Sequence, residues 1–495
     1  MKSIAMLPYL KKLGINTIHL LPITEIGIVG RKGDLGSPYA IKNPFKIDPL
    51  LADPLVPLSV EDQYKAFVDA AHFMGFRVVQ EFIFRTAAID SDWQQTHPEW
   101  FYWLNKKTSY GPPEFTPEQL EIILKIPTGK GAHIPPPLSY RDLFIIPPPP
   151  GSAKKHEIAS AFADWPPNDL QPPWSDVTYL RLYNYDFQAK NNFNYIAYNT
   201  IRYYDPELAN TENINHELWE QIAQIIPYYQ QRFGIDGAMI DMGHALPPEL
   251  KNKIISASRR IDPEFGFWDE NFSNKAKTKK EGYNAVIGGA WHRITKRNGF
   301  RRLLVESAKP KPLPFFGGAE THNTPRFGFD QDNKKRAAWL LFNLLPDVIP
   351  FLHNGFELHE QLPVNTGLNF TKKEIDYFSN LPLPLFYKNK LDWDTQDHLL
   401  SFITSIHQFR EAHPWVFNKS SAVELLDTRS KISGLKITHG NSEALALFNL
   451  DFRKKSIFQS LTITGKYLDL FTSELHEMSR SLTLPSGTVF LGIRQ

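Results

Sequence analysis

Two patterns of hydrophobic and polar positions alternate along the start of the chain, one typical of amphipathic helices and one typical of buried parallel strands. The opening segment "MKSIAMLPYLKKLG" predicts an amphipathic helix, and the compact apolar run "INTIHLLPI" predicts a strand buried on both faces. Ser59 and Asp62 then make a capping-box start, apolar residues recur at helical spacing, and Gly75 precedes the strand-like run "RVVQEFI". Helix followed by strand is the α/β pattern.

The same alternation returns after residue 215. It predicts a helix around 216–232, strands that end at Asp241 and Glu270, the short strands "AVIG" and "PFFGGAE", a helix near 334–345, and the strand "DVIPFL". With the runs near residues 17 and 78, these give seven strand candidates. Alternation of this length predicts a (β/α)8 TIM barrel, with its chemistry at the carboxyl ends of the strands.

Seven strands are one fewer than a closed barrel needs, and the chain opens on a helix where a barrel opens on a strand. A barrel without its first strand would leave two unpaired sheet edges facing each other. We therefore expect that the barrel lacks its first strand because the reading frame is truncated or starts too late.

Two further regions depart from the α/β pattern. Prolines crowd the segment from Gly111 to Trp174, which predicts a long irregular insertion after strand 3 of the barrel, over about residues 90–215. After a helix near 398–412, the segments "EALALFNLDF", "SLTITGKYLDLF" and "SLTLPSGTVFLGI" predict short strands between turns. We predict two domains, a catalytic barrel over 1–415 that includes the insertion and a C-terminal all-β sandwich over 416–495.

The charge balance and the cysteine content of the chain limit which kinds of molecule it could bind. The net charge of +2 arises from 55 basic and 53 acidic side chains without long runs of either sign, which argues against nucleic acid or an anionic membrane as the main partner. The absence of cysteine removes disulfides, thiol catalysis and zinc-thiolate sites, and is compatible with a reducing cytoplasm. We expect a cytoplasmic protein, and the sequence demands no cofactor and no metal. The sequence does not reveal the oligomeric state or any role for calcium.

The strongest chemical signal is a pair of carboxylates, each at the end of a strand-like run. Asp241 lies in "GIDGAMIDMGHALP" and Glu270 lies in "GFWDENFS". Cleavage of a glycosidic bond requires at least two carboxyl groups in one cleft, since one attacks the sugar carbon and the other protonates the departing oxygen. Without further information, a pair of buried structural carboxylates is an equally good interpretation.

Several long segments carry a family resemblance. The segments "GSPYAIKNPFKIDP", "DPLVPLSVEDQYKAFVDAAHF", "FRTAAIDSDW", "HPEWFYW", "GIDGAMIDMGHALP" and "ETHNTPR" resemble, in this order and spacing, the α-amylase superfamily (glycoside hydrolase family 13), and within it the bacterial maltosyltransferase branch. The resemblance implies a barrel whose amino-terminal part extends further, a C-terminal β-sandwich, and a retaining double displacement on α-1,4-glucans or maltooligosaccharides.

Carried over residue by residue, the resemblance makes Asp241 the catalytic nucleophile and Glu270 the general acid and base. Tyr39 resembles the aromatic platform beneath the sugar next to the cleaved bond, and His322 resembles a histidine that contacts sugar hydroxyls. His244, beside the end of the nucleophile strand, is a further candidate for substrate binding.

Three positions depart from the family pattern. Met239 replaces an arginine that holds the nucleophile ionised, Asn323 replaces a catalytic aspartate and keeps its size without its charge, and Glu81 replaces the aspartate that ends the third strand. Arg85 and the threonine after it match the maltosyltransferase branch. Losing the arginine and the third-strand aspartate together predicts a coupled rearrangement in which Arg85 or Glu81 reaches into the vacated space, although random decay would leave a similar pattern.

The sequence leaves three functions open. The first is transfer of a maltosyl or maltooligosaccharide unit between α-1,4-glucans, which the branch resemblance favours. The second is hydrolysis of the same glucans, with water as the acceptor. The third is a catalytically degenerate paralogue that binds glucan or a partner protein, for which Met239, Asn323 and Glu81 are the reasons.

Overall fold

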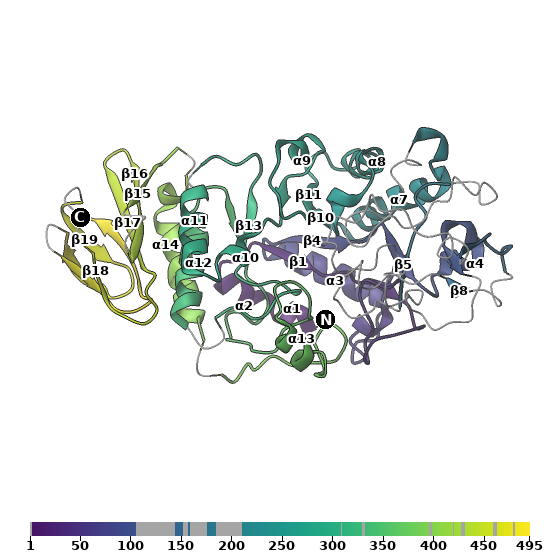
Figure 1. The fold of residues 1–495 in the computed structure, drawn as a ribbon, viewed down its shortest axis with the longest axis horizontal. Coiled ribbons are helices and arrows are strands. Elements are labelled where there is room, and N and C mark those ends of the chain that lie inside the picture. The colour runs from purple at the N-terminus through teal and green to yellow at the C-terminus, as the bar shows by residue number, and fades with distance from the viewer. Residues whose placement is uncertain are drawn as a thin grey trace, which may run out of the picture.

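The protein combines a curved parallel sheet surrounded by helices with antiparallel strands at the carboxyl end (Figure 1). The computed structural model describes residues 2–104, 144–151, 157–158, 176–184, 210–307, 309–328, 332–395, 398–418, 420–426, 431–458, 463–478 and 481–495. All statements about the structure concern these ranges.

In the described ranges, seven parallel strands form one sheet in the order β1, β4, β10, β11, β12, β13, β14. Each corresponds to one of the seven strand candidates, and β1 and β14 lie at the two edges. Their bounds are β1 Thr17–Leu20, β4 Arg77–Phe82, β10 Gly237–Ile240, β11 Gly266–Asp269, β12 Ala285–Val286, β13 Phe315–Gly317 and β14 Val348–Pro350. The predicted fold class, a parallel barrel-type sheet followed by an all-β region, is confirmed.

Helices connect the strands and pack on the outside of the sheet (Figure 1). Ser59 caps α3 by accepting a hydrogen bond from the backbone of Asp62, as predicted, and α7 ends at Gly234, whose φ of 78° is the left-handed conformation that glycine adopts without strain. The patterns did not predict α8 to α11. The bounds are α1 Lys2–Ala5, α2 Leu7–Lys12, α3 Val60–Phe73, α7 His216–Phe233, α8 Pro248–Arg259, α9 Ala276–Lys280, α10 Ala290–Arg293, α11 Arg297–Ser307, α12 Asp332–Leu344, α13 Lys372–Phe378 and α14 Leu400–Ala412.

Two features bring further segments to the carboxyl edge of the sheet. The antiparallel pair of β2 (Thr24–Ile26) and β3 (Ile41–Ile47) frames the loop that contains Tyr39. Most of the predicted insertion lies outside the described residues. Its described parts include α4 (Asp92–Thr96), a pair formed by β5 (Thr86–Ala88) and β9 (Val177–Tyr179), and a small sheet of β6 (Trp103–Leu104), β7 (Phe144–Ile145) and β8 (Glu157–Ile158).

The carboxyl-terminal strands form a six-stranded antiparallel sheet, in the order β15, β16, β17, β22, β19, β20, and a two-stranded sheet of β18 and β21. One face of the larger sheet packs toward the barrel helices, as the ring contact between Phe300 of α11 and Phe448 of β17 shows, and α11, α12 and α14 separate it from the parallel sheet (Figure 1). The bounds are β15 Ala422–Leu426, β16 Ile432–His439, β17 Ser442–Asn449, β18 Ser456–Phe458, β19 Lys466–Asp469, β20 Leu475–Glu477, β21 Leu482–Leu484 and β22 Val489–Arg494.

Length and apolar character together decide whether a helix could lie across a bilayer. Among the helices of the described ranges, none combines the two to the degree that a membrane span requires.

Candidate active site

Asp241 and Glu270 occupy corresponding positions at the ends of two neighbouring strands. β10 and β11 run parallel with Ile240 opposite Asp269, so the next residue along each strand is one of the two carboxyl groups. The backbone N–H of Asp241 donates to the carbonyl of Phe82 at 2.9 Å, and that of Glu270 donates to the carbonyl of Ile240 at 3.2 Å. The strand ladder therefore extends to both residues and directs their side chains to one face.

The surroundings of Glu270 favour its protonated form. Burial raises the pKa of Glu270 well above its usual range, and the charge of Asp241 and a hydrogen bond with the Asp241 side chain raise it further. The backbone N–H of Met242 donates to Glu270 Oε2 at 2.9 Å and opposes this shift in part. A carboxyl group that keeps its proton at neutral pH is equipped to protonate a leaving group.

Met242 brings its N–H to Glu270 through an uncommon backbone conformation. Its φ of 44° lies in the left-handed region, which a residue with a side chain adopts only when the surrounding structure enforces it. The sequence pattern gave no signal for this residue, since methionine is not a residue type that favours a left-handed turn.

Arg85 supplies the cation that position 239 lacks. Its Nε donates to Asp241 Oδ2 at 3.0 Å, and the two side chains are 13% and 9% exposed. A guanidinium ion next to a carboxylate favours the ionised form, which is the form that attacks a sugar carbon. The departure at Met239 therefore does not leave the candidate nucleophile without a positive neighbour.

Met239 itself fills the barrel interior one layer below the carboxylates. It lies opposite Glu81 on β4 and opposite Trp268 on β11, and it is buried. The Trp268 ring contacts the rings of Phe316 and His19, so this layer is lined mainly by apolar and neutral groups. Methionine suits an irregular space between such rings.

Tyr39, Glu81, His322 and Asn323 form one connected chain of polar contacts. The Tyr39 hydroxyl lies 3.1 Å from Glu81 Oε1 and 2.7 Å from His322 Nε2, and Asn323 Nδ2 lies 3.1 Å from the same His322 nitrogen. Burial, with smaller contributions from two other histidines, lowers the pKa of His322 to about 3, so its ring is neutral. The structure thus brings four predicted site residues together from three segments.

Asn365 belongs to the same cluster and was not predicted. Its Nδ2 donates to Asn323 Oδ1 at 3.2 Å. The segment around it carries no motif, because a single asparagine in a loop is usually a turn residue. Asn365 lies beside Asn323, which is 42 positions earlier in the chain, only because of the fold.

His244 contacts the backbone of the candidate acid. Its Nδ1 lies 2.9 Å from the carbonyl oxygen of Glu270, so it donates a hydrogen bond to that oxygen. Burial lowers the pKa of His244, and the neighbouring Arg85 and Lys251 lower it further. A neutral imidazole in this place orients the strand end that carries Glu270.

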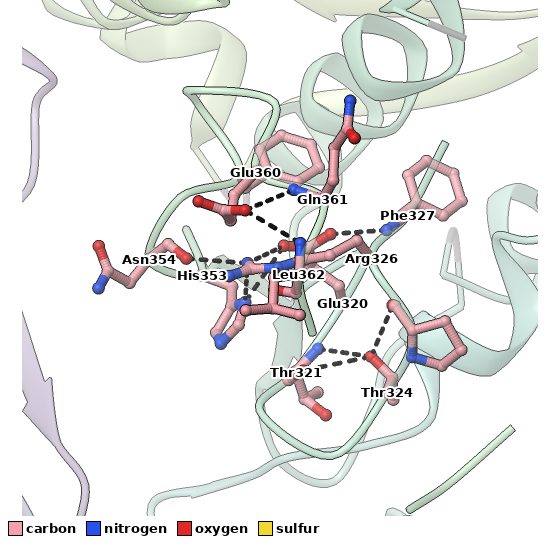
Figure 2. A network of polar contacts seen from close by, with 12 residues as sticks. Glu320, Thr321, Thr324, Arg326, Phe327, His353, Asn354, Glu360, Gln361 and Leu362 are labelled. Atoms are coloured by element: carbon pink, nitrogen blue, oxygen red, sulfur yellow. Dashed lines mark hydrogen bonds and ion pairs between the residues drawn. The ribbon is translucent and has the colours of Figure 1, made fainter. Parts of the chain in front are cut away.

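A second, unpredicted network anchors the loop that carries His322 and Asn323 (Figure 2). Glu320 accepts hydrogen bonds from Arg326 Nη1 and from the backbone N–H of Phe327, both at 2.7 Å, and His353 Nδ1 lies 3.2 Å from its Oε1. Burial alone would raise the pKa of Glu320, but His353 and Arg326 lower it to about 2. The ion pair fixes the start of the loop, two residues before His322.

The fold is similar to that of several solved α-amylases. It is similar to a noncanonic maltogenic α-amylase, AmyB, from Thermotoga neapolitana, with a TM-score of 0.62 and 17% identity over 99% of this chain and 93% of that one. An α-amylase from Lactobacillus plantarum gives a TM-score of 0.62 and 18% identity over 100% of this chain and 94% of that one.

In sequence, the chain is similar to enzymes named alpha-1,4-glucan:maltose-1-phosphate maltosyltransferase. The one from Cereibacter sphaeroides is 31% identical over 195 residues, which are 35% of this chain and 31% of that protein. The one from Mycolicibacterium smegmatis is 37% identical over 108 residues, or 20% and 15% of the two chains. The chain thus covers 31% or less of the length of these relatives. No protein-family model matches it. The predicted resemblance to the α-amylase superfamily, near its maltosyltransferase branch, is confirmed.

Proposed function

We propose that the protein is a retaining, α-glucan-active glycosyl-transferring enzyme in which Asp241 is the nucleophile and Glu270 the general acid and base. One observation carries the proposal: two hydrogen-bonded carboxyl groups follow neighbouring parallel strands, and their surroundings differ. The Arg85 guanidinium contacts the Asp241 carboxylate, while burial and the neighbouring Asp241 raise the pKa of Glu270 well above its usual range. Retaining glycosidases require this division of roles between two closely spaced carboxyl groups.

In the proposed mechanism, a sugar enters between the two carboxyl groups. Asp241 attacks the anomeric carbon while Glu270 gives its proton to the departing glycosidic oxygen, which leaves a covalent glycosyl-enzyme and an ionised Glu270. Glu270 then takes the proton of the acceptor hydroxyl as that oxygen attacks the anomeric carbon and Asp241 departs. Two inversions give net retention of configuration.

The names of the relatives support maltosyl transfer with an α-1,4-glucan as one of the substrates. The transfer proposed for this chain is of a maltosyl or maltooligosaccharide unit between α-1,4-glucans. A hydrolase would carry out the same first step and differ only in its acceptor, water. We also propose a cytoplasmic location, which the cysteine-free sequence supports.

One observation favours a second candidate, a glucan-binding protein without turnover. The amide of Asn323 makes hydrogen bonds to His322 and Asn365, so both of its polar atoms already have protein partners. A group engaged in this way contributes less to a sugar hydroxyl, and it lacks the charge that stabilises an oxocarbenium-like state.

Incubation with a labelled maltooligosaccharide series, with and without maltose 1-phosphate, tests the proposal. Transfer predicts products longer than the substrate, hydrolysis predicts shorter products alone, and Asp241→Asn should abolish both. Binding of the oligosaccharide without any product in the parent protein would establish the second candidate and refute the enzyme.

A further inference from the structure

The directions of the hydrogen bonds around His322 follow from the chemistry of its neighbours. Asn365 Nδ2 donates to Asn323 Oδ1, so the amide nitrogen of Asn323 faces His322. Because an amide nitrogen can only donate, His322 Nε2, 3.1 Å away, accepts this bond. The neutral ring therefore carries its proton on Nδ1 and none on Nε2.

Tyr39 has one hydroxyl proton, and His322 and Glu81 are among the polar neighbours of its oxygen. Its oxygen is 2.7 Å from His322 Nε2 and 3.1 Å from Glu81 Oε1. Because His322 Nε2 has no proton, the shorter contact requires Tyr39 to donate to it. The Tyr39 oxygen can then only accept from Glu81, and this requires a proton on Glu81 Oε1.

We propose that Glu81 is held as a neutral carboxylic acid and acts as a positioning residue: Glu81 donates to Tyr39, Tyr39 donates to His322, and this ordered chain fixes the Tyr39 ring beside the two catalytic carboxyl groups. The consequence for a bound sugar rests on the proposed function, since Tyr39 is the proposed platform beneath it. The protonation of Glu81 rests on the contacts alone.

The groups that face Glu81 agree with a neutral acid. The side chain is 1% exposed, and the carboxyl groups of Asp241 and Glu270 face it from the ends of β10 and β11. From β1, His19 Nε2 lies 3.7 Å from Glu81 Oε2, but burial lowers the pKa of His19 to about 4, so this ring is neutral and supplies no positive charge.

Two positions near Glu81 are the natural places for a cation. Residue 239, which lies directly opposite on β10, is a methionine, and Arg85 directs its Nε to Asp241. Burial and the charge of Asp241 accordingly raise the pKa of Glu81 to about 8.

Loss of the Glu81 proton reverses the chain. An ionised Glu81 accepts the hydroxyl proton of Tyr39, and Tyr39 then has no proton to give to His322. The contact of 2.7 Å between the Tyr39 oxygen and His322 Nε2 would then join two acceptors and lengthen. The site is therefore ordered at neutral pH and becomes disordered at alkaline pH.

Infrared spectroscopy of protein labelled with ¹³C at the glutamate side-chain carboxyl carbon tests this directly. The C=O stretch of a protonated carboxyl group is separate from the stretches of a carboxylate. We expect the parent protein to show a protonated-glutamate band at neutral pH, Glu81→Gln to lose part of it, and the lost part to titrate in the parent with a midpoint of about 8. Glu270→Gln is the matched control, because it removes a different part of the band.

Tyr39→Phe provides a test that does not depend on the folding of the Glu81 variant. It removes the acceptor of the Glu81 proton, so the Glu81 part of the band should move to higher frequency. A band that is unchanged in folded Glu81→Gln, or unmoved in Tyr39→Phe, would overturn the proposal. If the band is present but the parent forms no product from maltooligosaccharides, the proposed function fails and the protonation of Glu81 stands. If products form but the band is absent, the protonation of Glu81 fails and the proposed function stands.

Discussion

Glu81 and Glu320 are two glutamates at the carboxyl edge of the same sheet, and they differ in their protonation. Each is 1% exposed, one near the end of β4 and the other three residues after β13. The pKa of Glu81 is raised to about 8 by burial and Asp241, whereas that of Glu320 is lowered to about 2 because His353 and Arg326 outweigh burial.

The difference shows that the partners of a buried carboxyl group, and not its burial, decide its charge. Glu320 accepts from a guanidinium and from a backbone N–H, both at 2.7 Å. Glu81 contacts a hydroxyl group and lies opposite Met239. In the first region a fixed ion pair holds a loop in place, and in the second a neutral acid can order a chain of hydrogen bonds.

The largest predicted effect removes the cation of Glu320 and makes its surroundings resemble those of Glu81. Arg326→Met leaves a buried carboxylate unpaired and frees the carbonyl oxygens of Asn354 and Leu362, so the free energy of unfolding should fall by about 3–5 kcal/mol. Urea unfolding at neutral pH measures this fall in stability. Adding Glu320→Gln to Arg326→Met should recover part of the lost stability. A fall below about 1 kcal/mol in Arg326→Met would show that the ion pair between Arg326 and Glu320 does not fix the loop that carries His322.

The two glutamates should also give opposite pH dependences of stability. The raised pKa of Glu81 contributes stability that is present below the unfolded value of 4.5 and is lost as pH rises to about 8. The lowered pKa of Glu320 contributes stability that is present above 4.5 and is lost as pH falls toward 2.

Unfolding of the two glutamine variants at a series of pH values measures these contributions. The advantage of the parent over Glu81→Gln should shrink with rising pH and its advantage over Glu320→Gln should grow, each by on the order of 3 kcal/mol across its window. Parallel pH dependences in the two variants would contradict the comparison.

Only part of this comparison could be predicted from the sequence. The strand ends at Asp241 and Glu270 follow from local apolar runs, and the departures at Met239 and Glu81 follow from residue identity. Local patterns do not pair Arg85 with Asp241, which lies 156 residues away, because their contact depends on β4 lying beside β10. The family resemblance offered Arg85 or Glu81 for the vacated space without deciding between them.

The same limit applies to the Glu320 network. Arg326 is only six residues from Glu320, but nothing in the intervening "THNTP" indicates a buried pair, and the contact with His353 depends on β14 lying beside β13. The sequence does not reveal that this pair is buried, since charged residues in a turn-rich segment are usually solvated.

A smaller effect is expected from giving Glu81 the cation that Glu320 has. Met239→Arg puts a guanidinium opposite Glu81, so the Glu81 infrared band should disappear at neutral pH, at a cost of about 1–3 kcal/mol from crowding beside Trp268. Since an ionised Glu81 takes the hydroxyl proton of Tyr39 away from His322, Met239→Arg should lower the rate of product formation roughly tenfold, or by about 1.4 kcal/mol of transition-state stabilisation. An unchanged rate would show that the order of this hydrogen-bond chain does not limit activity.

The smallest effect on stability, and the sharpest separation of stability from activity, is expected at the ion pair between Arg85 and Asp241. Its side chains are 13% and 9% exposed, against 3% and 1% for Arg326 and Glu320, so water can replace part of what Arg85→Met removes. The free energy of unfolding should therefore fall by less than in Arg326→Met, by about 1–2 kcal/mol. Product formation should nevertheless fall by about a hundredfold, since the variant removes the guanidinium that contacts and positions the proposed nucleophile. Arg85→Lys keeps the charge without the Nε donor and should recover part of the activity. A large loss of stability with little loss of product formation would make Arg85 a structural residue like Arg326, and the two ion pairs would then have the same role.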